Sequence, residues 1–207
     1  MKVLPRGIYG ITVRGWGMDH IKSAEVLLRA GVRIIQYREK SLSTREMIED
    51  AKRVHELCMS YGAVFIVNDR VDVAYASEAD GVHLGQEDLP VELAKKILGD
   101  AIVGVSASTP EEGVLAEKVG ADYIGAGSIF PSRTKPEERV LGLEELKRLI
   151  ELVKLPVYAI GGIKLQHLEM LKRIGVYGVA VISEIFDSGD PYAKARLFVE
   201  TWKKLGD

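Results

Sequence analysis

Eight short apolar runs rich in β-branched residues alternate with amphipathic segments along the whole chain, and this alternation is what most constrains the fold. The runs lie at residues 8–13, 32–37, 64–68, 81–84, 102–105, 123–126, 157–160 and 179–182. The intervening segments carry apolar residues at helical spacing, at 23–30, 44–60, 91–98, 110–119, 143–153, 167–174 and 193–204. Alternation of strand and helix predicts a parallel sheet, and eight strands are the number that closes a single (β/α)8 barrel.

The domain organisation predicted from the sequence is simple. The chain has 207 residues, and no Pro/Ser-rich linker, low-complexity tract or block of charge divides it. We therefore expect one barrel domain spanning residues 1–207. A doubly wound open sheet is the alternative, because hydrophobic periodicity indicates the strands but not the closure of the ring.

Composition narrows the classes of function. Lys and Arg total 28 against 30 Asp and Glu, so no global field favours nucleic acid or an anionic membrane. The single cysteine, Cys58, excludes an internal disulfide and fits a reducing cytoplasm. Neither a signal peptide nor a membrane-spanning run is present in the sequence. We expect a cytoplasmic protein whose partners are small-molecule substrates, and the sequence leaves its oligomeric state open.

Polar clusters directly follow the predicted strands, which in a barrel would bring them to one mouth. After the second strand, Gln36, Arg38 and Lys40 alternate. Residues two apart in an extended segment share a face, so an amide and two cations would point together as an anion clamp. The alternative is a solvent-exposed ion-pair cluster formed with Glu39.

Two carboxylates follow the third and fourth strands. Asp69 and Asp88 would repel an anionic substrate unless a divalent cation lay between them. Mg²⁺ is typically held by one or two carboxylates together with substrate phosphate oxygens, so the pair forms a half-site that a diphosphate would complete. The alternative pairs Asp69 with Arg70 and makes Asp88 a capping residue before the helix that starts near Pro90.

A second group of anion-binding candidates follows the later strands. Residues 125–135 combine small residues with Ser132, Thr134 and Lys135, which can donate hydrogen bonds to phosphate oxygens. Gly161–Gly162 and Ser183 follow the seventh and eighth strands, where many barrels bind a phosphate. A role of the glycines in turns alone is the competing interpretation.

No nucleophile or base stands out in the sequence. His83 ends the fourth strand and could act as a base, although a packed, hydrogen-bonded orienting histidine is commoner at such a position. No Ser/His/Asp or Cys/His arrangement can be argued. The candidates therefore favour a reaction driven by loss of a metal-bound leaving group.

Seven motifs, in order along nearly the whole chain, resemble those of the thiamine-phosphate synthase family. They are Q-Y-R-E-K at 36–40, V-N-D-R at 67–70, G-V-H-L-G-Q-E-D at 81–88, G-V-S at 104–106, F-P-S-R-T-K at 130–135, A-I-G-G-I at 159–163 and I-S at 182–183. The family usually has Leu where Tyr37 stands, Thr at Ser132 and His at Ser108. Ser132 keeps a hydroxyl, and strand alternation turns Tyr37 away from its polar neighbours.

The resemblance implies a (β/α)8 fold and a transferase. The expected reaction condenses 4-amino-2-methyl-5-(diphosphooxymethyl)pyrimidine with a thiazole monophosphate by a dissociative, Mg²⁺-assisted route, giving thiamine phosphate and diphosphate. It implies that the pyrimidine diphosphate is held by Gln36, Arg38, Lys40, Asn68, Ser106 and Lys135, of which Arg38, Lys40, Ser106 and Lys135 are the expected catalytic residues. It implies Asp69 and Asp88 as ligands of Mg²⁺. It implies that the thiazole phosphate is held by Ser132, Thr134, Gly162, Ile182 and Ser183.

Two rival functions remain open at this point. One is a paralogue of the same fold that isomerises or only binds the thiazole phosphate, and it would be expected to lack the diphosphate and metal residues. The other is a sugar-phosphate isomerase barrel or a non-catalytic phosphate sensor, for which Asp69 and Asp88 would be superfluous.

Overall fold

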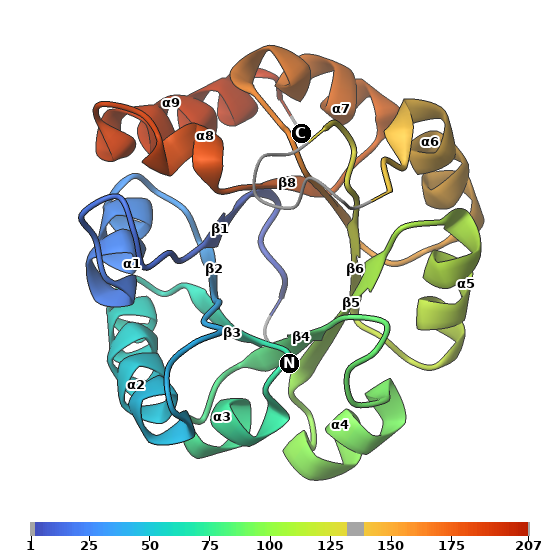
Figure 1. Cartoon of the computed structure of the whole chain (residues 1–207). Coiled ribbons are helices and arrows are strands. Elements are labelled where there is room, and N and C mark those ends of the chain that lie inside the picture. Colours follow the sequence, from blue (N-terminus) through green and yellow to red (C-terminus); the bar gives the residue numbers. More distant parts are fainter. Residues whose placement is uncertain (1–2, 132–138, 207) are drawn as a thin grey trace.

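The computed structural model describes residues 3–131 and 139–206 and shows a closed barrel of eight parallel strands surrounded by helices (Figure 1). Each strand pairs in parallel with its neighbours in sequence, and β8 pairs with β1 to close the ring. The prediction of a single (β/α)8 barrel is confirmed, and the open sheet is wrong. The strands are β1 (Gly7–Ile11), β2 (Ile34–Tyr37), β3 (Val64–Asn68), β4 (Gly81–Leu84), β5 (Ile102–Ala107), β6 (Tyr123–Ala126), β7 (Val157–Ile160) and β8 (Gly178–Val181).

The helices follow the predicted segments closely, with differences that local chemistry explains. Helix α1 begins at His20, earlier than predicted, because the Asp19 carboxylate accepts a hydrogen bond from the Lys22 N–H and caps it. Helix α3 is six residues long and was not predicted, since so short a segment shows little periodicity. The helices are α1 (His20–Arg29), α2 (Thr44–Ser60), α3 (Val71–Ala76), α4 (Val91–Leu98), α5 (Pro110–Lys118), α6 (Gly142–Leu152), α7 (Leu168–Ile174) after a 3-10 turn η1 (Leu165–His167), α8 (Ser183–Phe186) and α9 (Pro191–Lys204).

Two apolar layers hold the barrel together. The larger lies between the strands and the surrounding helices, and the smaller fills the inside of the barrel. On β2, Ile34 and Gln36 point inward while Ile35 and Tyr37 pack on the helix side. This confirms that Tyr37 faces away from its polar neighbours, and it places every second residue of a strand end at the mouth.

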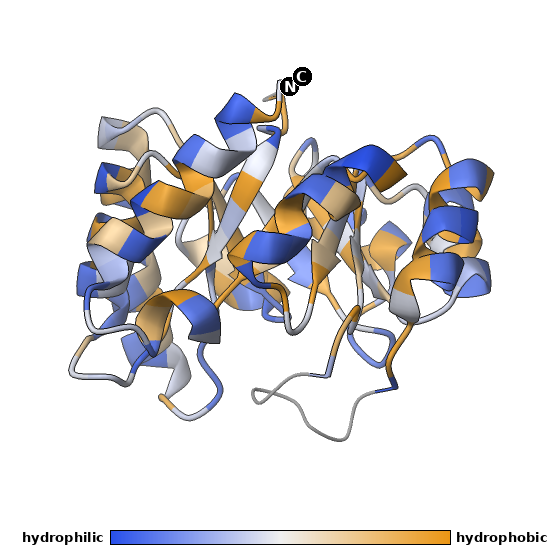
Figure 2. Ribbon diagram, turned by 90° about the horizontal axis from the view of Figure 1, so that it is seen from above, coloured by the Kyte–Doolittle hydropathy of each residue, from blue (hydrophilic) through white to orange (hydrophobic). Residues whose placement is uncertain are grey.

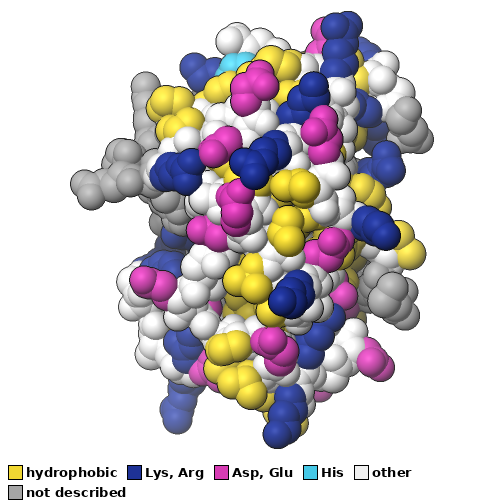
Figure 3. Space-filling model, turned by 90° about the vertical axis from the view of Figure 1, so that its right-hand side faces the viewer, with side chains coloured by type: hydrophobic (Ala, Val, Ile, Leu, Met, Phe, Trp, Pro, Cys, Tyr) yellow, Lys and Arg dark blue, Asp and Glu magenta, His cyan; other side chains and the backbone are white. Residues whose placement is uncertain are grey.

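The molecular surface and the two chain ends add little to the interpretation of function. The helices present hydrophilic residues outward and hydrophobic residues to the strands, and both termini lie at the same end of the barrel (Figure 2). On the face shown in Figure 3, acidic and basic side chains are interspersed with scattered hydrophobic ones. Within the described residues, none of the helices has the length and apolar character needed to cross a membrane.

Candidate active site

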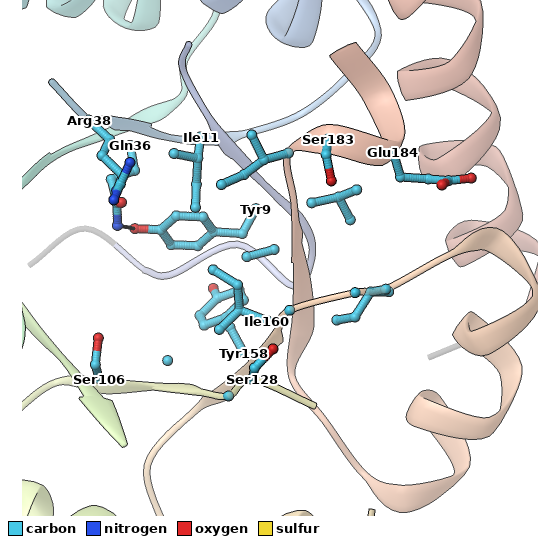
Figure 4. Close-up of a pocket in the computed structure, with 18 of the residues that line it drawn as sticks. Tyr9, Ile11, Gln36, Arg38, Ser106, Ser128, Tyr158, Ile160, Ser183 and Glu184 are labelled. Carbon is cyan, nitrogen blue, oxygen red and sulfur yellow. Dashed lines mark hydrogen bonds between the residues drawn. The ribbon is translucent and has the colours of Figure 1, made fainter. Parts of the chain in front are cut away.

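A cavity of about 460 Å³ opens where the carboxyl ends of the strands meet (Figure 4). Gln36 and Arg38 enter it from β2 and the following loop, and Ser106 enters from β5 on the facing side. Gly162 and Ser183 line it beyond β7 and β8. The fold thus gathers side chains from distant parts of the sequence around one pocket.

The cluster after β2 divides between the pocket and the rim. Gln36 and Arg38 line the cavity, while the exposed Lys40 forms an ion pair with Asp69. Glu39 is not part of an exposed cluster, because its side chain is only 5 % exposed. Its carboxylate accepts hydrogen bonds from the backbone N–H groups of Lys40 (2.7 Å) and Ser41 (2.6 Å), and it pairs with His20 (3.1 Å). The alternative of a solvent-exposed ion-pair cluster is therefore wrong for Glu39.

Asp69 and Asp88 lie together at the rim beside Lys40. The Asp88 carboxyl hydrogen bonds to that of Asp69, and burial together with the Asp69 charge raises the pKa of Asp88. Burial also acts to raise the pKa of Asp69, but hydrogen bonds from Lys40 and Asp88 and the Lys40 charge hold it below its ordinary value. Asp69 adopts φ of 60°, a left-handed conformation that strains a residue with a side chain.

The alternative roles for these two carboxylates do not hold. Arg70 pairs with Asp72 (2.5 Å), not with Asp69. Asp88 accepts a hydrogen bond from the Gly85 N–H (2.6 Å) within its own turn, and the cap position of α4 is Pro90. Asp88 is thus oriented by its own turn and Asp69 by Lys40 and Asp88, and neither carboxylate caps a helix.

The two carboxylates are too few to hold a divalent cation by themselves, but their chemistry would fit one. Among the described residues, no group of three or more His, Cys, Asp or Glu side chains gathers as a metal site. When both carboxyls are ionised they repel one another, and a hard cation between them would relieve that repulsion. The pair therefore fits a Mg²⁺ half-site of the kind that substrate oxygens complete.

The opposite side of the cavity is formed by the loops after β7 and β8. Gly161 and Gly162 have φ of 98° and 62°. A Cβ on Gly161 would lie 2.0 Å from the Ser128 Oγ, and one on Gly162 would lie 2.6 Å from the Pro131 carbonyl oxygen. These glycines thus have a packing and turn role, which does not exclude ligand binding. In the described part of the chain, the backbone N–H groups of Gly162 and Ser183 have no acceptor.

The remaining predicted site residues lie either in the cavity or outside the described residues. Ser132, Thr134 and Lys135 lie outside the described residues. Asn68, Ile182 and His83 line the cavity with the residues above. The sequence reasoning missed three aromatic residues that form the cavity floor, and strand alternation could have found them, since each points inward from its strand. They are Tyr9, Tyr123 and Tyr158.

The fold and the site are those of a (β/α)8 barrel enzyme, whose pocket lies at the carboxyl ends of the strands. Comparison with known proteins agrees. Residues 8–185 match the family model described as thiamine monophosphate synthase. The thiamine-phosphate synthase of Caldivirga maquilingensis is 52% identical over 200 residues, covering 96% of this chain and 98% of that protein. That of Archaeoglobus fulgidus is 47% identical over 199 residues, covering 96% and 94%.

A solved structure supports the same assignment. The structure titled thiamine phosphate pyrophosphorylase from Pyrococcus furiosus superposes with a TM-score of 0.91 at 42% identity, covering 97% of each chain. The chain belongs to the thiamine monophosphate synthase family. It is accordingly an enzyme of the transferase class that acts in thiamine biosynthesis on small-molecule substrates.

Proposed function

We propose that this protein condenses 4-amino-2-methyl-5-(diphosphooxymethyl)pyrimidine with a thiazole monophosphate, releasing diphosphate and thiamine phosphate. The observation that carries the proposal is the Asp69–Asp88 pair beside Lys40, at the rim of the cavity that Arg38, Asn68 and Ser106 line. A site for a monophosphate alone has no need of two carboxylates. A diphosphate bound through a divalent cation does.

The pyrimidine diphosphate would occupy the side of the cavity next to β2–β5. Gln36, Asn68 and Ser106 would hold the ring and orient it. Arg38 and Lys40, with Lys135 from outside the described residues, would donate to the diphosphate oxygens. These cations would take up the charge that develops on the leaving group, so no protein nucleophile is required.

Asp69 and Asp88 would hold Mg²⁺, and when bound the ion neutralises charge on the diphosphate. The contacts of Lys40 support two roles for it in the proposed reaction. It keeps Asp69 ionised, and it stands at the place where the diphosphate oxygens would approach. Substrate oxygens would complete the coordination that the two carboxylates begin.

The thiazole phosphate would occupy the side next to β7 and β8. Among the described residues, the N–H groups of Gly162 and Ser183 have no acceptor and would be available to phosphate oxygens, and Ile182 lines the cavity beside them. Ser132 and Thr134 would add hydroxyl donors. Both substrates would thus meet in one cavity with their anionic groups on opposite sides.

In the reaction, the bond between the pyrimidine methylene carbon and the diphosphate oxygen breaks, and the electron pair leaves with diphosphate. The electron-rich aminopyrimidine stabilises the resulting cation. The lone pair of the thiazole nitrogen then forms the new carbon–nitrogen bond. The protein's contribution is to place the two rings and to stabilise the departing charge.

Product formation tests the proposal directly. The protein is incubated with both substrates and Mg²⁺, and thiamine phosphate is measured after oxidation to a fluorescent thiochrome. EDTA should abolish turnover. Asp69→Ala and Asp88→Ala should each lower kcat/KM by at least about 100-fold, because leaving-group charge is no longer neutralised.

The matched control is Asp72→Ala, which removes a nearby but exposed carboxylate that pairs only with Arg70 in the described structure. It should keep activity within about 3-fold. Circular dichroism confirms that each variant is folded. Full activity of the Asp69→Ala/Asp88→Ala double variant would overturn the metal assignment, and failure of folded wild-type protein to form thiamine phosphate would overturn the proposed reaction.

A further inference from the structure

A continuous chain of hydrogen bonds crosses the barrel below the cavity. The Gln36 Nε2 donates to the Tyr9 hydroxyl (3.0 Å), as Figure 4 shows, and the Tyr9 and Tyr123 hydroxyls lie 2.8 Å apart. The Tyr123 hydroxyl lies 3.0 Å from the His83 Nδ1, and the His83 Nε2 lies 2.9 Å from the Ser106 Oγ. The side chains of this hydrogen-bond chain come from five strands. They connect Gln36 with Ser106, the two predicted substrate contacts at its ends.

The direction of this chain follows from its first member. An amide nitrogen only donates, so the Tyr9 oxygen accepts from Gln36. In the described structure, the Tyr9 proton then has one acceptor, the Tyr123 oxygen, and leaving a buried hydroxyl proton without one is costly. The Tyr123 proton accordingly goes to the His83 Nδ1, and the His83 Nε2–H donates to Ser106.

The two tyrosines of this hydrogen-bond chain stay neutral. Burial raises the pKa of Tyr9 and Tyr123 well above the ordinary value of a phenol, so both hydroxyls keep their protons at neutral pH. The Tyr9–Tyr123 link is then a hydrogen bond between uncharged groups. A reversal of the chain would require every link, including the Gln36 amide, to turn over together.

The backbone leaves room for the two central rings. A Cβ on Gly104 would lie 2.0 Å from the Tyr123 Cζ, and one on Gly125 would lie 2.9 Å from the His83 Cε1. The Tyr123 and His83 ring centroids are 5.4 Å apart. Two strand positions therefore lack side chains where these rings lie, which fixes where the Tyr123 hydroxyl can point.

We propose that Tyr123 is a positioning residue, which holds His83 as the Nε2–H tautomer and thereby leaves the Ser106 hydroxyl proton free to donate into the cavity. With its oxygen occupied as an acceptor by His83, Ser106 presents a donor to the substrate, while Gln36 presents its Oε1 as an acceptor at the other end. The identity of that substrate rests on the proposed function above. The tautomer itself does not.

The first test needs no substrate. In protein labelled with ¹⁵N in its four histidines, the nitrogen shifts of His83 distinguish the two neutral tautomers, and His83→Gln identifies its signals by their loss. We expect the Nε2–H tautomer in the wild type and a mixture in Tyr123→Phe. A wild-type His83 in the Nδ1–H tautomer would overturn the proposal, whether or not the variant folds.

The second test compares kinetics with a matched hydroxyl deletion. Tyr177→Phe removes a hydroxyl that donates to the Leu4 carbonyl (2.8 Å) at the other end of the barrel, within the same aromatic cluster. Tyr123→Phe should lower kcat/KM by about 10–100-fold and raise KM for the pyrimidine substrate but not for the thiazole phosphate. Tyr177→Phe should stay within about 3-fold of wild type.

A further pair of variants checks which ring nitrogen matters. His83→Gln can still present an amide donor near the Nε2 position, whereas His83→Asn reaches only the Nδ1 position. The Gln variant should retain more activity than the Asn variant. Equal loss in both, or a Tyr123→Phe variant no different from Tyr177→Phe, counts against the proposal. If the wild type forms no product, the proposed function fails while the tautomer measurement still decides this inference.

Discussion

Two hydrogen-bonded networks leave strand β2 in opposite directions, and they differ in charge. Inside the barrel, Gln36 begins the neutral chain through Tyr9 and Tyr123. At the rim, Glu39 keeps its charge: although burial acts to raise its pKa, hydrogen bonds from Ser41 and His20 and from the Lys40 backbone lower it to about 2. The comparison shows that the buried charge of Glu39 is stabilised by several N–H and O–H donors that converge on it.

The difference has a consequence for the site. The Glu39 network fixes the backbone of the loop that carries Arg38 and Lys40, so Arg38 is held in the pocket and Lys40 is held beside its ion-pair partner Asp69. The interior chain instead sets which groups donate and accept. The Glu39 network thus positions charged side chains, and the hydrogen-bond chain inside the barrel determines which groups donate and which accept.

The largest expected effect comes from crowding the interior chain. Gly104→Ala places a Cβ 2.0 Å from the Tyr123 Cζ, so the ring must leave its position inside the barrel. We expect a loss of at least about 3 kcal/mol in the free energy of unfolding, measured by urea denaturation. Gly189→Ala, whose Cβ meets no atom within 4 Å, is the control and should change stability by less than about 0.5 kcal/mol. Similar stabilities for the two variants would show that the interior chain is not sterically confined.

The next effect concerns the rim network and its pH dependence. Glu39→Gln replaces a carboxylate that accepts several hydrogen bonds, and we expect a loss of about 2 kcal/mol in unfolding free energy at neutral pH. Because the folded-state pKa is lowered from 4.5 to about 2, this contribution is complete above pH 4.5 and disappears as pH falls through about 2.

Denaturation at a series of pH values measures this directly. The gap between wild type and Glu39→Gln should be constant above about pH 5 and should narrow steadily in acid. Glu49→Gln, on the exposed face of α2, is the control. A gap that persists unchanged to the lowest pH would mean that Glu39 stabilises the loop by shape rather than by charge.

The sequence predicted the barrel and the side chains at its mouth better than the contacts buried inside the molecule. Strand alternation predicted the barrel and placed Gln36 and Arg38 on one face, because period-2 patterning depends on local geometry. It did not reveal that Glu39 is buried, since the donors around it come from His20 and the loop backbone, which no short motif records. The Tyr9–Tyr123 contact spans 114 residues of sequence and depends on the closure of the ring.

The smallest effect separates the two kinds of partner that Glu39 has. Arg14 pairs with the Glu39 carboxylate (3.0 Å), but its side chain is 47 % exposed, so solvent and salt screen the pair. We expect Arg14→Ala to lower the unfolding free energy by only about 0.5 kcal/mol, and to lower it less as salt is raised to about 0.5 M. The loss in Glu39→Gln should respond less to salt, because its hydrogen bonds from the Lys40 and Ser41 backbone are short-range and partly buried. An Arg14→Ala variant as unstable as Glu39→Gln would show instead that the ion pair, not the convergence of N–H groups, keeps the charge at this rim.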